Sequence, residues 1–220
     1  MKVIGISGSP IPDSNTDRAL KIALNATGVE TEFIKLSDYV YSPCRACLGC
    51  EDTNVCVIED DATDLAQKVR SADAVIIAGY TPYSSLDGWT KSFLERLYQL
   101  RHKTGLMREK PGGIIITSAI PPGNEMLPPA SKHAIESVSY YMMEEGMEIM
   151  GSVCVMGNVP CIRCNHEEQC GMSAVKMMFG PDTIRASIPI QKVEDQKDVV
   201  SGLVALGKSI GERVQQAKKE

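Results

Sequence analysis

Five short apolar runs alternate along the chain with longer stretches in which apolar residues recur at helical spacing. The runs are mostly rich in valine and isoleucine and lie at residues 2–7, 32–36, 73–79, 112–118 and 147–156. Strands that are apolar throughout are buried on both faces, which is typical of a parallel sheet with helices on each side. The alternation therefore predicts an α/β fold, with helices that begin near residues 14, 60, 89, 131 and 195.

Five strands joined by helices suit a doubly wound, flavodoxin-like sheet with the strand order 2-1-3-4-5. Ligands of such sheets bind beyond the carboxyl ends of the strands, at the switch point between strands 1 and 3. The length of 220 residues suits a single domain over residues 1–220. Residues 157–191 fit no alternation of strand and helix, so we expect them to form an insertion after the fifth strand.

The loop over residues 7–16 joins the first strand to the first helix, at the predicted switch point. Its hydroxyl and amide side chains, together with the start of a helix, are groups that hold an anion. Its glycines do not have the spacing of a dinucleotide-binding loop, and it lacks the Gly-Lys-Ser/Thr of a Walker loop. We expect it to bind the phosphate of FMN, the alternative being a capped turn without a ligand; the candidate residues are Ser7, Ser9, Ser14, Asn15 and Thr16.

Four cysteines fall within thirteen residues at the spacing C-x2-C-x2-C-x5-C. Structural zinc sites usually join two C-x2-C pairs through a long spacer. Three cysteines at two-residue gaps instead wrap a cubane iron–sulfur cluster, where each thiolate reaches a different iron. Gly49 is expected to supply a positive φ for this turn. We predict a [4Fe–4S] cluster on the loop 43–60, with zinc or a redox disulfide as alternatives; the ligands would be Cys44, Cys47, Cys50 and Cys56.

A second set of cysteines begins in the fifth predicted strand and continues into the insertion. Its spacing is C-x6-C-x2-C-x5-C, and its last two gaps repeat the last two gaps of the first set. We predict a second iron–sulfur cluster or a zinc site, with His166 as a possible ligand, at the same sheet edge as the phosphate loop and the first cysteine loop. The alternative is one buried strand cysteine and three incidental ones; the residues are Cys154, Cys161, Cys164 and Cys170.

The composition of the chain excludes some classes of binding partner and indicates where the protein works. A net charge of -5 gives no basic surface for nucleic acid. No apolar run approaches the ~20 residues that span a membrane, and the first residues lack the segments of a signal peptide. Eight cysteines without a secretion signal indicate a reducing, cytoplasmic setting. His102 and His133 lie in charged, helical surroundings and are expected at the surface, and no catalytic triad is visible.

At these motifs the chain resembles the archaeal iron–sulfur flavoproteins of the NAD(P)H-dependent FMN reductase branch of flavodoxin-like proteins. The loop GISGSP…SNT, the segment PCRACLGCEDTNVCVIEDD and the strand order carry the resemblance, best over residues 1–120. The resemblance implies one FMN and one [4Fe–4S] cluster per subunit, in homodimers or homotetramers that bring a cluster near a neighbouring flavin. It also implies that two loops frame the isoalloxazine, through Pro82, Tyr83, Ser84, Ser118, Gly123 and Asn124.

Three segments depart from the pattern of those relatives. Ile11 stands where arginine is usual, which removes a charge-assisted contact to phosphate. Residues 81–83 read Thr-Pro-Tyr in place of Pro-Val-Tyr. The loop 119–124 has one glycine and two prolines where relatives are glycine-rich, and proline has no N–H to offer the flavin.

We interpret the chain as an oxidoreductase for electron transfer, passing electrons between a one-electron carrier such as ferredoxin and a flavin-linked acceptor. Two alternatives remain open at this point. One is an NAD(P)H-dependent FMN or quinone reductase with an auxiliary cluster. The other is a flavin-free metal-binding scaffold that docks a partner protein. Methionines crowd the C-terminal half and indicate apolar packing at a subunit interface.

Overall fold

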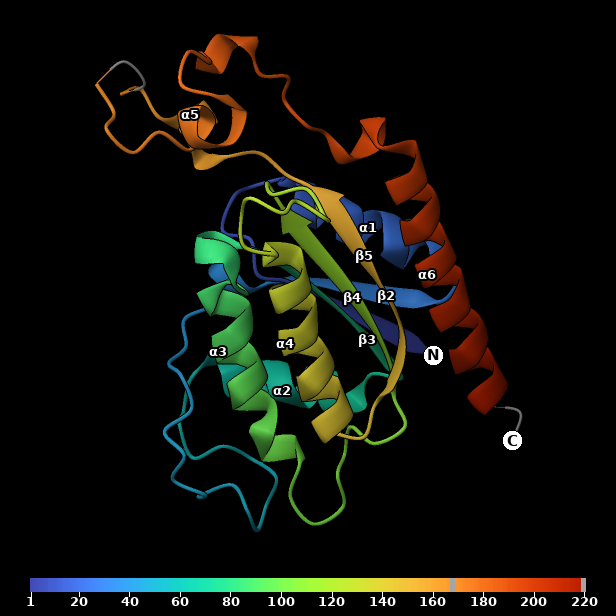
Figure 1. Cartoon of the computed structure of the whole chain (residues 1–220). Coiled ribbons are helices and arrows are strands. Elements are labelled where there is room, and N and C mark those ends of the chain that lie inside the picture. Colours follow the sequence, from blue (N-terminus) through green and yellow to red (C-terminus); the bar gives the residue numbers. More distant parts are fainter. Residues whose placement is uncertain (167–168, 219–220) are drawn as a thin grey trace.

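A five-stranded parallel sheet forms the centre of the computed structural model, which describes residues 1–166 and 169–218 (Figure 1). The strands pair in the order β2-β1-β3-β4-β5, and every pair is parallel. The predicted order is confirmed, and each strand begins within two residues of its expected position. The strands are β1 (Lys2–Ser7), β2 (Glu30–Lys35), β3 (Ala74–Tyr80), β4 (Pro111–Ser118) and β5 (Glu148–Met156).

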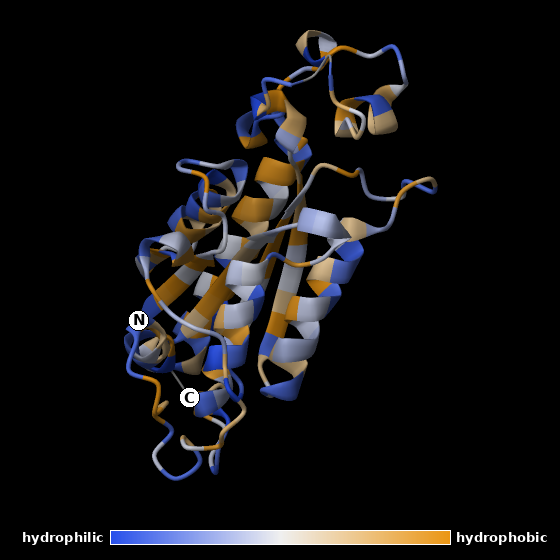
Figure 2. Cartoon of the chain, turned by 90° about the vertical axis from the view of Figure 1, so that its left-hand side faces the viewer, coloured by the Kyte–Doolittle hydropathy of each residue, from blue (hydrophilic) through white to orange (hydrophobic). Residues whose placement is uncertain are grey.

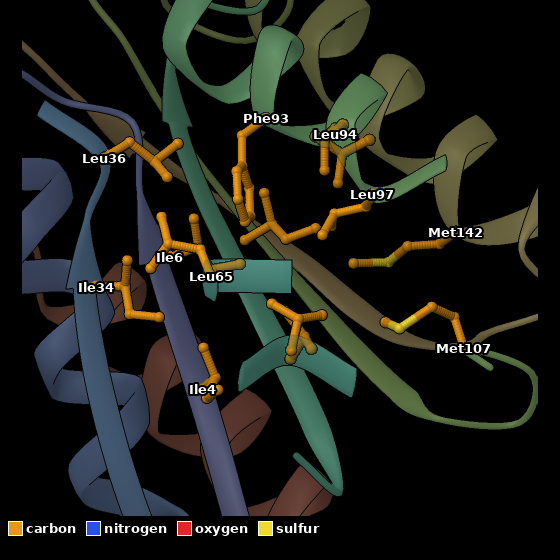
Figure 3. Packing of buried hydrophobic residues seen from close by; sticks show 14 of the residues in the cluster. Ile4, Ile6, Ile34, Leu36, Leu65, Phe93, Leu94, Leu97, Met107 and Met142 are labelled. Atoms are coloured by element: carbon orange, nitrogen blue, oxygen red, sulfur yellow. The ribbon is translucent and has the colours of Figure 1, made fainter. Parts of the chain in front are cut away.

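Helices cover both faces of the sheet, as Figure 1 shows. Alternate strand residues point to opposite faces, so Ile4 packs with the helices of one face while Val3 packs with those of the other. Figure 3 shows the first of these cores, where Leu65 and Phe93 meet the sheet. One face carries α2 (Asp61–Ser71), α3 (Gly88–Arg96) and α4 (Ala130–Glu144), and the other carries α1 (Asn15–Ala26) and α6 (Lys197–Ala217).

Local sequence signals fix where the helices start. Ser14 Oγ accepts a hydrogen bond from the Asp17 N–H, and the Asp17 carboxylate accepts one from the Ser14 N–H, which completes a capping box at α1. The Asp60 and Asp87 side chains cap α2 and α3, where they accept from the Ala62 and Thr90 N–H groups. The helix expected to begin near residue 89 is α3, which ends at Arg96 and continues as a 3-10 turn, Leu97–Leu100.

The insertion follows β5 at the end of the sheet where the strands finish, and Figure 1 shows it standing above that edge. Its described residues form the turn Pro160–Arg163 and the short helix α5 (Ala174–Phe179). The two ends of the insertion are tied together, since the Asn158 amide exchanges two hydrogen bonds with the Gln191 backbone, each 2.8–2.9 Å long. Within the described ranges, no helix combines the length and apolar character needed to cross a membrane.

The first cysteine loop lies at the opposite end of the molecule, which corrects the expectation that it shares an edge with the phosphate loop. Figures 1 and 2 both place it far from the insertion. Cys50, Asp52 and Asn54 of this loop contact residues 99–103, which follow α3 and lead into the start of β4. The chain leaves β2 at the carboxyl edge but then runs down along α3, so sequence order alone misplaced the loop.

Candidate functional site

The phosphate loop packs tightly against the start of α3. A Cβ at Gly8 would lie 1.9 Å from Thr90 Oγ1 and 2.6 Å from Asp87 Oδ1, so only glycine fits there. The Asp87 carboxylate is fully buried and accepts from the N–H groups of Tyr80 and Thr90. Burial raises the pKa of Asp87 to about 6. These contacts hold the loops after β1 and β3 in fixed positions beside each other.

The polar side chains predicted to face a phosphate are largely engaged with the protein. Ser7 Oγ donates to Asp17 Oδ1 at 2.6 Å, and Thr16 Oγ1 donates to Thr117 Oγ1 at 2.9 Å. Ser9 Oγ accepts from the Ile11 N–H at 3.4 Å. The backbone N–H groups in the first turn of α1 have no partners within the helix and carry its partial positive charge. An anion at this loop would therefore meet backbone donors, with the side chains holding the loop in shape.

Asn15 connects this loop to the insertion. Its amide donates to the Gln191 carbonyl at 2.9 Å and to the Met156 carbonyl at 3.4 Å, and its oxygen accepts from the Val193 N–H at 3.2 Å. The side chain is thereby committed to both ends of the insertion. Asn15 thus couples the geometry of the predicted phosphate site to the segment that stands above it.

A buried ion pair beneath the loop was missed by sequence reasoning. Lys35, the last residue of β2, donates to Asp17 Oδ2 at 2.6 Å and to the Ile11 carbonyl at 3.0 Å. The Lys35 and Asp17 side chains are 12% and 3% exposed. The ammonium group balances a carboxylate that would otherwise oppose an anion, and it lies beside the position where the expected arginine is absent.

The loops after β3 and β4 complete this edge. Tyr83 and Ser84 both adopt left-handed conformations, with φ of 49° and 58°, and the Tyr83 ring is wholly exposed. Such consecutive strained residues without glycine are typical of functional loops. After β4, Ser118 Oγ bonds with the Ile120 backbone, and Asn124 Oδ1 accepts from the N–H groups of the two residues that follow Glu125. Gly123 takes a φ of 78° between them, and Pro82 begins the turn that contains Tyr83.

At the other edge, the first cysteine loop turns through several left-handed residues. Positive φ values occur at Ala46, Leu48 and Asn54, and not at Gly49, so the predicted role of that glycine is wrong. A Cβ at Gly49 would lie 2.8 Å from a Val57 methyl carbon. Glycine is therefore required there for close packing of the loop upon itself.

A polar stripe at the end of α3 supports the loop. The Cys56 N–H donates to Gln99 Oε1 at 2.9 Å, and the Asn54 amide donates to the Gln99 and His102 carbonyls at 2.9 and 3.0 Å. His102 Nε2 lies 3.3 Å from Cys50 Sγ, so His102 is a partner of the loop rather than the free surface residue expected. Arg96, Gln99 and His102 follow one another at three-residue spacing. This is the period of a 3-10 helix, and the 3-10 turn Leu97–Leu100 lies between the first and the last of them.

Cys50 lies within range of the charges of the other three thiols of this loop. Burial raises the pKa of Cys50, and Cys56, Cys44 and Cys47 raise it further. Among residues 1–166 and 169–218, no three Cys, His, Asp or Glu side chains are grouped to hold a single metal ion. A cubane places each thiolate on a different iron, so its ligands stand further apart than those of one ion. The donor set and its position on one turning loop fit such a cluster.

The second cysteine set is divided between two elements. Cys154 lies within β5, where burial raises the pKa of its thiol and a hydrogen bond to Ser131 of α4 opposes that shift. Cys161 and Cys164 share one turn, in which the Cys164 N–H donates to the Cys161 carbonyl at 3.1 Å. Cys170 and His166 belong to the same insertion. The predicted second metal centre stays a prediction, and Cys154 is the one of its four cysteines that lies in a strand of the sheet.

A pocket of about 500 Å³ lies between the cysteine loop, α3 and α4. Cys44 and Leu48 line the side of the pocket formed by the loop. Tyr98, Tyr140 and Tyr141 line the opposite side. Leu48, Tyr98 and Tyr140 are 49%, 37% and 56% exposed. An apolar, aromatic surface of this kind is typical of a contact with a partner.

Comparisons with known proteins agree with this geometry. Residues 1–126 match the family model described as NADPH-dependent FMN reductase. An iron–sulfur flavoprotein of Methanocaldococcus jannaschii is 33% identical over 154 residues, which are 69% of this chain and 76% of the relative. An iron–sulfur flavoprotein of Methanosarcina thermophila is 29% identical over 162 residues, which are 72% of this chain and 82% of the relative.

Solved structures show the same fold at low sequence identity. RosB, solved with a bound flavin-derived intermediate, superposes with a TM-score of 0.66 at 13% identity, over 100% of this chain and 81% of RosB. An archaeal flavodoxin superposes with a TM-score of 0.53 at 14% identity, over 98% of this chain and 99% of the flavodoxin. With its family model and its relatives taken together, the chain belongs to the NADPH-dependent FMN reductase family of oxidoreductases, alongside the archaeal iron–sulfur flavoproteins.

Proposed function

We propose that this protein is a redox flavoprotein that binds FMN at the carboxyl edge of the sheet and a [4Fe–4S] cluster on the loop 43–60. It would pass electrons between a one-electron carrier of the ferredoxin class and a flavin-linked acceptor. The family match and the names of its relatives support the flavin and the iron–sulfur cluster. When bound, the flavin takes up one or two electrons, whereas the cluster takes up one at a time.

Residues at the carboxyl edge of the sheet would bind the flavin, and residues at the opposite edge would bind the cluster. The N–H groups at the start of α1 would hold the FMN phosphate, with Lys35 and Asp17 beneath them. The loops that carry Tyr83 and Asn124 would lie beside the isoalloxazine. At the other edge, the thiolates of the cysteine loop would ligate the irons, and Gln99 and His102 would hold that loop in place.

The observation that carries the proposal furthest is the separation of the two sites. The seven residues of β3 span about 23 Å at ~3.3 Å per residue, so the phosphate loop and the cysteine loop of one subunit lie at opposite ends of the sheet. Electron transfer between them calls for a second copy of the chain. An antiparallel two-fold dimer through α3 and α4 would bring the cysteine loop of one subunit to the carboxyl edge of the other.

Exposed apolar residues support that assembly. Tyr98 on the turn after α3, and Tyr140 and Met143 on α4, present apolar surface beside the pocket, and Met143 is 62% exposed. Tyr83 and Met126 are 103% and 90% exposed at the opposite edge. A two-fold contact requires apolar surface at both ends of this face, since each end of one subunit meets the other end of its partner.

Anaerobic purification tests the proposal directly. We expect about one flavin and at least four irons with four sulfides per chain, and a sedimenting species larger than the 23.9 kDa monomer. The protein should be reduced by dithionite-reduced ferredoxin. The family description favours a second candidate, an NADPH-dependent flavin reductase, which the same protein would reveal by rapid flavin bleaching with NADPH alone. Flavin-free protein, or a monomer at micromolar concentration, would contradict the proposal.

A further inference from the structure

Arg96 is the last residue of α3, and its side chain is entirely buried beneath the first cysteine loop. Arginine is seldom buried without a specific set of partners, because removing its charge from water is costly. The cysteine loop is otherwise a surface segment, and its tip residues Arg45 and Leu48 are exposed. The contacts of Arg96 should therefore show why a charged side chain is buried directly under such a loop.

Four of the five N–H groups of Arg96 have an assigned acceptor. Nη1 donates to the Ser42 carbonyl at 2.9 Å and to Asp60 Oδ2 at 2.7 Å. Nη2 donates to the Ile58 carbonyl at 3.3 Å and to Thr63 Oγ1 at 3.2 Å. The fifth, Nε–H, is buried without a partner in the part of the chain that the structure describes.

These partners stand on both sides of the cysteine loop. Ser42 precedes the first ligand, Cys44, by two residues, and Ile58 follows the last ligand, Cys56, by two. Asp60 joins the two sides again, because its Oδ2 accepts from both the Ser42 N–H and Arg96. The two ends of the loop, Ser42 before the four cysteines and Ile58 and Asp60 after them, are called its neck below. Arg96 closes this neck, because its guanidinium group donates hydrogen bonds to both ends.

Arg96 also acts on one of the predicted ligands. Arg96 Nη2 donates to the Ile58 carbonyl, and the N–H of the same Ile58 donates to Cys56 Sγ at 3.5 Å. The Cys56 backbone is fixed independently by Gln99, at 2.9 Å. The positive charge thus lies beside the Cys56 corner of the loop.

We propose that Arg96 is the positioning residue of the iron–sulfur cluster, closing the neck of the cysteine loop and stabilising the reduced cluster with its charge and its remaining N–H. This inference rests on the proposed function, in which the loop holds a cluster. One-electron reduction, with the electron supplied by the carrier, adds one negative charge to the cluster. A fixed positive charge and N–H groups near the sulfurs favour that reduced state and raise the potential.

Redox titration of the anaerobic holoprotein, followed by its visible absorption, separates this role from a purely structural one. R96Q removes the charge and should lower the ratio of reduced to oxidised cluster at a given potential about tenfold, a shift of about 59 mV for one electron. D60N removes the opposing carboxylate at the same neck and should shift the potential upward. R108Q is the control, since Arg108 carries the same charge on the neighbouring loop but is 74% exposed, and should leave the potential unchanged.

R96K is a second variant that tests the inference if R96Q fails to fold. Lysine retains the charge but cannot make four directed hydrogen bonds, so its potential should stay near that of the wild type. Its neck should be looser, seen as faster loss of iron to a chelator and faster thiol alkylation in iron-free protein. Equal potentials for R96Q, R108Q and wild type, or shifts of the same sign for R96Q and D60N, would overturn the inference alone. Wild-type protein without iron would overturn the proposed function and this inference together.

Discussion

Lys35 Nζ lies 2.6 Å from Asp17 Oδ2, beneath the loop that joins β1 to α1. The two residues come from neighbouring elements, and both are nearly buried. A carboxylate at this point would repel a phosphate above it, and the ammonium group removes that repulsion. The pair also fixes the Ile11 carbonyl, since Lys35 donates to it at 3.0 Å.

The first prediction follows from this pair. K35M should weaken FMN binding by about 1–3 kcal/mol, the scale of losing a hydrogen bond to a charged group, because Asp17 would then face the phosphate uncompensated. Riboflavin has no phosphate and should lose much less affinity. K21M serves as the matched control, because Lys21 is 51% exposed on α1. Flavin titrations measure the wild type and both variants, and equal losses for FMN and riboflavin in K35M would contradict the electrostatic account.

Asn15 gives a second prediction. N15A removes hydrogen bonds to Gln191, Met156 and Val193, so hydrogen exchange should become faster at both ends of the insertion. We expect the protein to lose about 1–3 kcal/mol of stability, since buried backbone groups would be left unpaired. N25A, at an exposed position of the same helix, is the control. Unchanged exchange near residues 156 and 191–193 would show that the insertion is held by other contacts.

Cys47 tests the assignment of the first cysteine loop. C47S should remove most of the broad visible absorption, iron and sulfide of anaerobic protein. FMN should stay bound, because its predicted phosphate loop lies at the opposite edge of the sheet. C154S provides the comparison, since Cys154 belongs to β5 and not to this loop. Full iron and sulfide in C47S would exclude Cys47 as a ligand.

The second cysteine set predicts metal beyond one four-iron cluster per chain. Replacing Cys161 and Cys164 together by serine should remove that metal and leave the first cluster intact. The same change should loosen the insertion, since a bound metal offsets the cost of ordering an irregular segment. Iron with extra sulfide would indicate a second cluster, and zinc would indicate a structural site. Four irons and no zinc in anaerobic wild-type protein would contradict both.

Glu145 predicts a pH dependence of stability. Burial raises its pKa to about 6, with Arg101 opposing and Glu144 adding to that shift. The folded state therefore holds a proton that the unfolded chain releases at lower pH. The free energy of unfolding of iron-free protein should fall by about 2 kcal/mol as pH rises from ~4.5 through 6, at ~1.4 kcal/mol per pKa unit.

E145Q tests this assignment, since it removes the titrating group at nearly constant shape and should flatten the decline. E144Q, at an exposed neighbour, should leave the slope unchanged. Denaturant unfolding at several pH values measures both. A slope that survives in E145Q would assign the dependence to another buried carboxyl, and Asp87 would then be the first to examine.

The sequence by itself determined the sheet and its order. Uniformly apolar runs such as Ala74–Tyr80 report burial on both faces, and burial is a local property of a strand. The capping box at Ser14 is likewise encoded within four residues. Cysteine spacing predicted a cluster loop, because the gaps between ligands are fixed by the chemistry of the group they would hold.

Only the tertiary structure decided where that loop lies and what supports it. A loop of about 25 residues between β2 and α2 can reach either edge of the sheet, and its packing along α3 selects the far one. Arg96 and His102 gain their partners from segments 36 to 54 residues away. Lys35 meets Asp17 for the same reason, since β2 pairs with β1 in register. Periodicity and spacing describe each segment alone, whereas these contacts depend on which elements fold against one another.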